Sequence, residues 1–527
     1  MLPSLPEELL AHIFSYLALP SAARLVDIAD DRQGHSIEDI RAWKNMQLTQ
    51  QTLVNICLSS KTLYRLAWPT LYSAYSTWLA SEGSTSSAYF LRTLCLKPEY
   101  GKILRSFSIR DLELDGGLTM DTLYHYADLL TGDAITMATF QWRARNFWLE
   151  GYEGGLIFQD RLVRSLLIGL DDAIMCMVLL MCPNITELDI SMPYSYQSPS
   201  LVADLFAIIV SPQTEQPPSG SVFEPASSRY VASQLFGTSW PDAQWQQPGV
   251  LEFLSEFTLR SGDNVAWEPL LTHATLLPSL KTLKIFNLIE GPSKDWLAAI
   301  MRRKAPQLRI LHLAECSIGD TSLCDIFQLF PNLRTLSIDW SAMYHGFIPM
   351  REIGRAIARY TPRVMHLTLD ASSYHMVEDS LDEAHRMSSM LCDSIKNMAH
   401  LERLKVSEQP VWTPLLVQNG RGLETESREV KSCIGHALPT KLAWLEVVFQ
   451  RHPSLYWEDH NLWAEYQRWQ DRDLRALLLD ESFTKLRRVD IHGFEREVCT
   501  RSVRESGWLR EAIEIEGGGR TERLSRQ

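Results

Sequence analysis

Three short groups of residues have types that could do chemistry, but none has the partners such chemistry needs. Asp382-Glu383-Ala384-His385 matches the acidic box of ATP-dependent helicases, yet the sequence contains no G-x-x-x-x-G-K-[ST] loop to hold a nucleotide. Cys176 and Cys182 lack the spacing and the His partners of a zinc site, and they lie in an apolar run typical of core thiols. His452 and His460 have no third convincing ligand. We therefore expect no catalytic residue, cofactor or metal.

Other motifs and the overall composition narrow the function further. No H-E-x-x-H, G-x-S-x-G or G-x-G-x-x-G occurs anywhere in the 527 residues. A formal net charge of −13 disfavours a nucleic-acid binder, because phosphate contacts rely on clustered Lys and Arg. We expect a protein that is not an enzyme and that acts by binding other proteins.

Cysteine usage and hydropathy indicate the compartment. The nine cysteines are odd in number and form no C-x-x-C pair, and Glu7 and Glu8 stand where a signal peptide would be basic and then apolar. The most apolar run, residues 173–182, is far shorter than the roughly 20 residues of a membrane span. The sequence therefore favours an intracellular protein, in the cytoplasm or the nucleus, without a membrane segment.

The first element that must position binding residues is an amphipathic helix near the N-terminus. Ser4 and Glu7 form a capping box, and Pro6 lies in the first turn, where its missing N–H costs nothing. Apolar residues then recur every four positions, at Leu5, Leu9, Ile13 and Leu17. One helix this short cannot bury its stripe alone, so it needs a partner within the chain or in another protein.

A second helical region follows after a polar stretch at about residues 20–50. The pattern predicts a short helix over 37–46 and then a clear helix running from Thr52 to Ala67, which Pro69 ends at or just before Trp68. The second helix must fold back onto the first across the intervening insertion.

Together these helices resemble an F-box, the module by which substrate receptors attach to the Skp adaptor of a cullin-RING ubiquitin ligase. The first half of that pattern is matched by Leu5-Pro6, Glu8-Leu9, Ile13-Phe14 and Leu17, and the second half by residues 57–67. The resemblance covers residues 1–80 and implies an adaptor-binding set, namely Leu5, Pro6, Leu9, Ile13, Leu17, Leu58 and Leu63. The alternative is a helical cap on the domain that follows, and such a cap should bury its apolar stripe fully.

The remainder of the chain carries a repeat with apolar residues at positions 0, +3 and +5. Clear copies start at Leu280, Leu308 and Leu333, and Cys316 extends the middle copy to L-x-x-L-x-L-x-x-C, the leucine-rich-repeat signature. Looser copies start at Leu104, Ile185, Leu254, Val364, Leu401, Leu442 and Leu486. A single L-x-x-L-x-L occurs by chance in Leu-rich proteins, but three well-spaced copies in a row favour a repeat array.

Each copy predicts a short strand followed by a helix. Period-two alternation sends the +3 and +5 residues inward and their neighbours outward. The return path is visible once, where Thr321 is expected to cap a helix that Pro331-Asn332 stops. The predicted fold class is α/β, with a small all-α F-box followed by an irregular leucine-rich-repeat solenoid, a curved parallel sheet with helices on its outer side.

The predicted domains follow from these elements. Residues 1–80 form the helical module, and residues 81–500 form the solenoid, with insertions at about 211–250 and 409–439. Residues 501–527 form a C-terminal segment that is expected to be disordered from Gly517.

The function that these elements favour is that of a substrate receptor. The helical module would bind the Skp adaptor, and outward-facing residues of the strands would bind a protein substrate for ubiquitination. The candidates are Glu256, Thr258, Arg260, Thr282, Lys284, Phe286, Ile310, His312, Thr335, Ser337 and Asp339. They form no single-sign patch. The alternative is a leucine-rich-repeat scaffold that bridges proteins without any ligase.

Overall fold

The structure is a computed structural model that divides into two compact units. Unit 1 comprises Met1–His35 with Asp39–Leu280, and unit 2 comprises Ser36–Glu38 with Lys281–Gln527. The structure describes residues 6–15, 17, 37–76, 85–109, 158, 161–162, 165–166, 171–191, 201–210, 251–260, 267–288, 307–341, 348–371, 395–407, 438–448, 477–478, 482–492, 508–515 and 519–526.

The first helices that the structure describes are α1 (Glu7–Ser15), α3 (Ile37–Ser59) and α4 (Lys61–Leu71). The two helices predicted over 37–46 and 52–67 are wrong in their boundaries, because one helix runs to Ser59 and the break falls at Ser60. The Ser60 hydroxyl accepts a hydrogen bond from the Leu63 N–H at 3.1 Å, so it caps the new helix. Pro69 does not end α4, since the Tyr72 N–H still reaches the Trp68 carbonyl at 2.9 Å.

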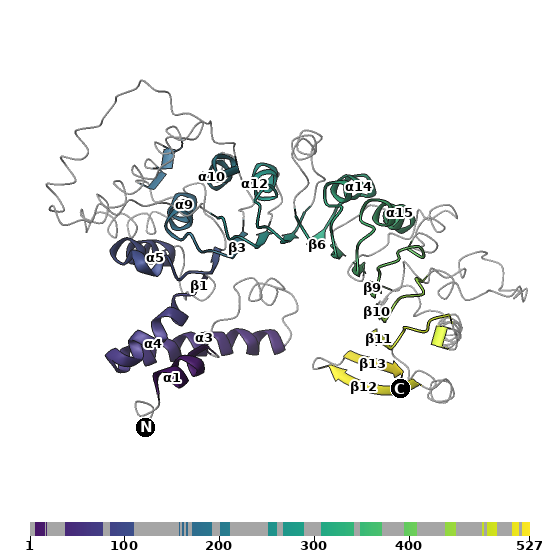
Figure 1. The fold of residues 1–527 in the computed structure, drawn as a ribbon, viewed down its shortest axis with the longest axis horizontal. Helices are drawn as coiled ribbons and strands as arrows, with labels where there is room; N and C mark the ends of the chain where they lie inside the picture. Colours follow the sequence, from purple (N-terminus) through teal and green to yellow (C-terminus); the bar gives the residue numbers. More distant parts are fainter. Residues whose placement is uncertain are drawn as a thin grey trace, which may run out of the picture. The chain divides into compact units, whose positions relative to one another are not determined.

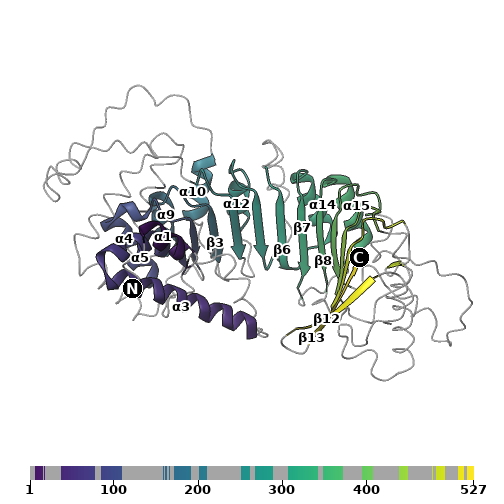
Figure 2. The ribbon, with the colours of Figure 1, turned by 60° about the horizontal axis from the view of Figure 1, so that its bottom comes forward.

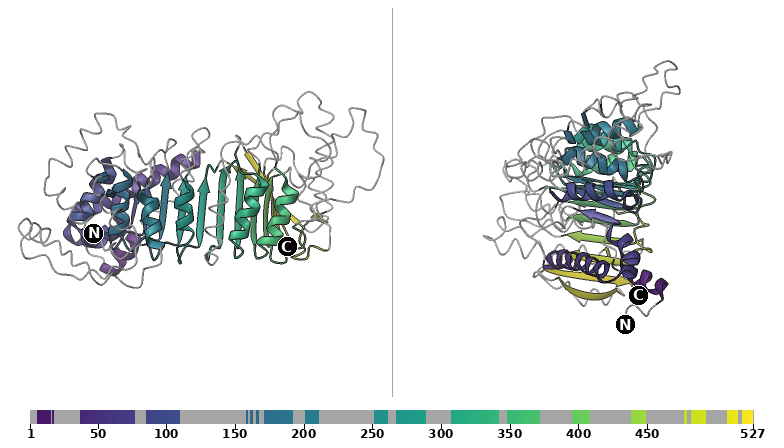
Figure 3. Two further views of the ribbon diagram at one scale, coloured as in Figure 1. Left: turned by 90° about the horizontal axis from the view of Figure 1, so that it is seen from above. Right: turned by 90° about the vertical axis from the view of Figure 1, so that its left-hand side faces the viewer.

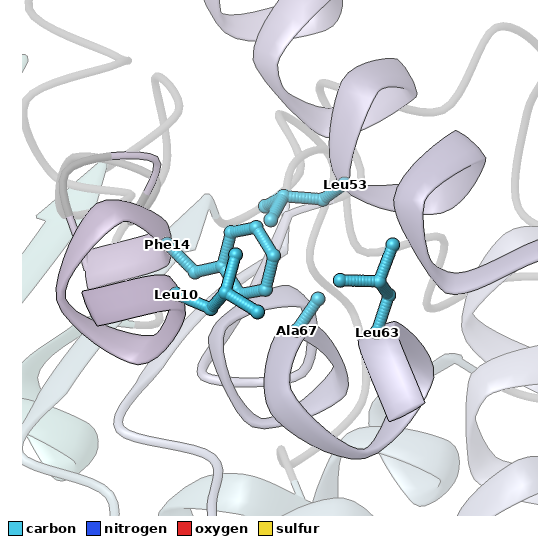
Figure 4. Packing of buried hydrophobic residues seen from close by; sticks show 5 residues of the cluster. All are labelled: Leu10, Phe14, Leu53, Leu63 and Ala67. Carbon is cyan, nitrogen blue, oxygen red and sulfur yellow. The ribbon is translucent and has the colours of Figure 1, made fainter. Parts of the chain in front are cut away.

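These helices share one small core, which Figure 4 shows from close by. Leu10 and Phe14 of α1 pack against Leu53 of α3 and against Leu63 and Ala67 of α4. The two halves of the N-terminal pattern therefore fold back onto each other. We call α1, α3 and α4 together the helical module.

The rest of unit 1 alternates strands and helices. Its strands are β1 (Ala74–Ser76), β2 (Ser106–Ile109), β3 (Glu187–Ser191) and β4 (Glu256–Arg260), and they pair in parallel in sequence order. Its further helices are α5 (Thr85–Leu96), the 3₁₀ helix η3 (Pro98–Tyr100), α9 (Asp171–Met181), α10 (Leu201–Val210) and α12 (Trp267–Ala274). In Figure 1, α5, α9, α10 and α12 lie along one side of these strands.

Unit 2 continues the same pattern. Its parallel strands are β5 (Thr282–Phe286), β6 (Ile310–Cys316), β7 (Thr335–Trp340), β8 (His366–Asp370), β9 (Arg403–Ser407), β10 (Trp444–Val448) and β11 (Arg488–His492). Helices α14 (Asp320–Leu329) and α15 (Met350–Tyr360) connect β6 to β7 and β7 to β8. Figure 2 shows β6, β7 and β8 side by side, and Figure 3 shows α14 and α15 in front of the strands.

The repeat template predicts these strands correctly. Each of the ten predicted copies, from Leu104 to Leu486, coincides with one of the strands β2 to β11. Every residue at positions 0, +3 and +5 is buried, with at most 4% of its surface exposed. The α/β fold class with mostly parallel open strands is thus confirmed, and it is compatible with a solenoid.

Two local expectations are corrected. Helix α14 begins at Asp320 after Gly319, so Thr321 lies inside the helix and does not cap it. The tail is not disordered from Gly517, because Gly519–Arg526 forms β13, which pairs antiparallel with β11 and with β12 (Trp508–Ile515). This hairpin covers the last edge of the parallel strands, where unpaired backbone groups would otherwise be exposed.

Other expectations differ in their boundaries or fall outside the described residues. Strand β1 lies within the 1–80 segment that was predicted as a helical module. The two compact units divide after Leu280. The insertion at 211–250, residues 409–437 of the second insertion, the Asp382–His385 group and both His452 and His460 lie outside the described residues.

Two candidate binding surfaces

The first candidate surface is the outer side of the helical module. Leu9 and Ile13 of α1 are 51% and 40% exposed, and Leu58 near the end of α3 is 80% exposed. Leu9 and Ile13 are four residues apart, so they share one face of α1. The buried Leu10 and Phe14 occupy the other face. The amphipathic helix therefore has two apolar faces, of which only one is covered.

The other residues of the predicted adaptor set have different environments. Pro6 is exposed and Leu17 is half-buried against the core of the module, whereas Leu5 lies outside the described residues. The prediction that Leu63 binds the adaptor is wrong. Only 7% of its surface is exposed, because it packs in the core with Leu10 and Phe14. Its side chain cannot contact a partner in this structure.

Polar and aromatic contacts hold the helical module in place. Arg65 of α4 forms an ion pair with Glu7 of α1. The Tyr100 ring of η3 lies 4.7 Å from Trp68 and 4.3 Å from Tyr72, measured between ring centroids. The Tyr100 hydroxyl is also hydrogen-bonded to the Tyr64 hydroxyl of α4. Helix α4 is thus fixed both to α1 and to the segment that precedes β2.

The second candidate surface is the face of the parallel strands in unit 2 that carries the outward-pointing, half-buried residues. We call this surface the inner face. Along β5, β7 and β8, buried residues alternate with half-buried ones, as period-two strands require. The half-buried residues on this face include all the predicted candidates of β5 to β7, namely Thr282, Lys284, Phe286, Ile310, His312, Thr335, Ser337 and Asp339.

The predicted candidates on β4 differ from those in unit 2. Glu256 is half-buried, but Thr258 is fully buried and Arg260 is 4% exposed. Arg260 Nε lies 3.3 Å from Oδ1 of the equally buried Asp189 on β3. The prediction that Thr258 and Arg260 face outward and bind substrate is therefore wrong, because both side chains are buried. A buried guanidinium stays charged when a carboxylate is paired with it, and Asp189 provides that carboxylate for Arg260.

The register places further residues on the inner face that sequence reasoning missed. Thr335 on β7 is opposite His366, His366 is opposite Arg403, and Arg403 is opposite Trp444, which in turn is opposite Arg488. All these residues stand at position +2 of their repeat copies, as the predicted Thr282, Ile310 and Thr335 do. Applying the same position to the later copies would have found them.

An aromatic ring lies between two guanidinium groups in this row. The Cζ atoms of Arg403 and Arg488 are 3.5 Å and 4.0 Å from the centroid of the Trp444 ring. Because the two arginines lie on the strands that flank β10, they occupy opposite faces of the ring. Cation–π attraction of this kind holds both guanidinium planes in fixed orientations.

The opposite ends of the strands carry carboxylates. Asp339 and Asp370 are directly opposite each other on β7 and β8. Burial, together with the charges of Asp370 and Glu315, raises the pKa of Asp339 to about 7, although Lys405 opposes the shift. Lys405 Nζ lies 3.7 Å from Asp370 and 3.3 Å from Glu446. The inner face is therefore basic and aromatic at one end of the strands and acidic at the other.

The buried cysteines among the described residues behave as core residues. Cys176, Cys182 and Cys316 are buried free thiols, and burial raises the pKa of each. Within the described ranges, no group of three or more His, Cys, Asp or Glu side chains is arranged to hold a metal ion. Among the helices that the structure describes, none has both the length and the apolar composition that a membrane crossing requires.

No model of a known protein family matches this chain, and no curated protein matches it either.

Proposed function

We propose that this chain is the substrate-recognition subunit of an SCF-type ubiquitin ligase, which consists of a Skp adaptor, a cullin and an F-box protein. The helical module acts as the F-box and binds the adaptor through Leu9, Ile13 and Leu58. The inner face of the repeats binds a protein substrate. The chain itself breaks no bond and would work in the cytoplasm or the nucleus.

The observation that carries this proposal is the uncovered apolar face of α1. The helical module has its own core, with Leu10 and Phe14 nearly inaccessible to solvent, so the exposure of Leu9 and Ile13 does not come from poor packing. A helical cap would bury its whole stripe against the repeats. Covering a Leu or Ile side chain completely is worth about 1.5–3 kcal/mol, which a partner helix can gain by docking here.

The connection between the module and the first strands supports the same role. Helix α4 ends at Leu71, and the Ser73 carbonyl just beyond it accepts hydrogen bonds from the Arg105 and Ser106 N–H groups at 2.8 Å and 3.2 Å. The module therefore joins the strands of unit 1 without a linker. A receptor increases the effective concentration of its substrate, and a stiff connection preserves more of that gain than a flexible one.

The test is binding of the purified full chain to the purified Skp adaptor. The double variant Leu9→Asp/Ile13→Asp should weaken binding at least 100-fold, since each interface hot spot contributes about 2 kcal/mol or more. Leu96→Asp is the matched control, because Leu96 is an exposed apolar residue at the end of α5, outside the motif. It should leave binding unchanged.

Two results would reject the proposal in different ways. If the unaltered chain does not bind the adaptor, the ligase role is wrong and the repeat scaffold without a ligase becomes the better interpretation. If the double variant and the control bind equally well, α1 is not the contact surface.

A further inference from the structure

At the basic end of the inner face, Arg403 forms no salt bridge with any residue that the structure describes. Arg488 is paired with Asp490, whose Oδ2 lies 2.7 Å from Arg488 Nε and 2.5 Å from Nη2. Asp490 also accepts hydrogen bonds from Trp444 Nε1 at 3.1 Å and from Arg523 Nε at 3.2 Å. Arg403 is exposed, and its guanidinium stacks on the face of Trp444.

The stacking of Arg403 on Trp444 prepares it for a planar anion. A guanidinium that lies flat on a ring keeps its N–H groups directed sideways, away from the ring. Two of these N–H groups form a fork that matches the two oxygens of a carboxylate. Because the Trp444 ring already restricts the Arg403 side chain, binding costs less side-chain entropy than at a free surface arginine.

The surroundings of Arg403 fit a single negative charge better than a double one. His366, directly opposite Arg403, has its pKa lowered by burial and by the charge of Arg403, so this neighbour adds no second full cation near pH 7. On the other side of Trp444, Arg488 and Arg523 share the Asp490 carboxylate. On the Arg403 side of the Trp444 ring, a dianionic group would therefore meet one full cation among the described residues.

From these contacts we propose that Arg403, stacked on Trp444, binds the side-chain carboxylate of an acidic, extended segment of the protein substrate. This inference rests on the proposed receptor function and names the class of substrate segment that the inner face recognises. The protein as a whole is acidic, but charges more than about 8 Å away are largely screened at physiological salt, so the local cation decides the contact.

The experiment measures fluorescence anisotropy of labelled peptides with the full chain. The probe is Gly-Ser-Glu-Glu-Glu-Ser-Gly, compared with the same peptide carrying Gln, phosphoserine or Lys at the three central positions. We expect the Glu peptide to bind at least tenfold more tightly than the Gln and Lys peptides and no more weakly than the phosphoserine peptide. Raising the salt concentration should weaken the binding of the Glu peptide.

Arg403→Gln should reduce the affinity for the Glu peptide at least tenfold, because it removes the charge and keeps the length of the side chain. The matched control is Arg359→Gln. Arg359 is also exposed, and its Cζ lies 5.1 Å from the Tyr360 ring, but it belongs to helix α15 and not to the inner face. The control should bind the Glu peptide as the unaltered chain does, and both variants should keep its melting temperature.

Several outcomes would overturn the inference. These are equal loss in the two variants, tighter binding of the phosphoserine peptide by tenfold or more, and preference for the Lys peptide, which would point to the acidic end of the strands. Adaptor binding measured on the same samples separates the two proposals. If the unaltered chain and Arg403→Gln both bind the adaptor but the unaltered chain binds no Glu peptide, only this inference fails. If the peptide binds and the adaptor does not, only the ligase role fails.

Discussion

Replacing Asp339 by Asn should stabilise the protein at alkaline pH and have a smaller effect at acidic pH. Burial, reinforced by Asp370 and Glu315, raises the pKa of the Asp339 carboxyl from 3.8 to about 7 in the folded protein. The folded state therefore holds the proton more tightly than the unfolded state does. As the pH rises from about 4 to 7, the wild-type protein loses free energy of unfolding through this group, and above pH 7 the loss is complete.

Asn has the shape of a protonated Asp and carries no charge, so the variant avoids this loss. A pKa shift of about 3 units lowers the free energy of unfolding by roughly 4 kcal/mol once the group is fully ionised. About 3 kcal/mol of this decrease occurs between pH 5 and pH 8.5. Because Asp339 is only half-buried on the inner face, water reduces the effect, and we expect the advantage of the variant to grow by about 1–3 kcal/mol over that range.

The assay compares melting temperatures of the full chain and of Asp339→Asn at pH 5 and pH 8.5. For a unit of this size, 1 kcal/mol corresponds to about 2–4 °C. Asp325→Asn, on the helix α14, is the control and should show no such difference between the two pH values. An equal gain at both pH values would mean that packing, and not ionisation, causes the effect. A loss of stability at pH 8.5 would refute the raised pKa of Asp339.

Three further predictions test other parts of the fold. Gly101→Ala should destabilise unit 1 by about 1–3 kcal/mol in thermal unfolding, because the new Cβ would overlap the Met181 carbonyl oxygen. In iodoacetamide labelling at pH 8 followed by peptide mapping, the buried Cys182 and Cys316 should react only after unfolding, because burial raises the pKa of each thiol, to about 12 for Cys316. The half-buried Cys57 should react before these two. A chain that ends at Gly507 should associate in light-scattering measurements, because removal of β12 and β13 exposes the edge of β11.

Local patterns predicted the strands of the repeats well because each strand buries the same three positions. The spacing 0, +3 and +5 is a property of a few neighbouring residues and needs no knowledge of the rest of the chain. Strand β1 has only three residues, and β13 reads Gly-Arg-Thr-Glu-Arg-Leu-Ser-Arg, in which Leu524 is the one apolar residue. Such strands exist because a neighbouring edge offers backbone partners, and the sequence alone does not carry that information.

The candidate sites were predicted less completely for the same reason. Thr258 occupies an outward position of its repeat, and nothing in its neighbours along the chain indicates that it is fully buried. Trp444 lies between Arg403 and Arg488, which are 41 and 44 residues away in the sequence. Only the register of three successive strands brings these side chains together.

Helix α4 explains which residues of the motif remain available to a partner. Leu63 and Ala67 face the core with Leu10 and Phe14, while Trp68 and Tyr72 contact Tyr100. The side chains of α4 therefore make two internal contacts, one with α1 and one with the segment before β2. If the helical module binds an adaptor, the binding energy must come from side chains that neither contact uses. Leu9 and Ile13 on α1 and Leu58 on α3 meet this condition, and Leu63 does not.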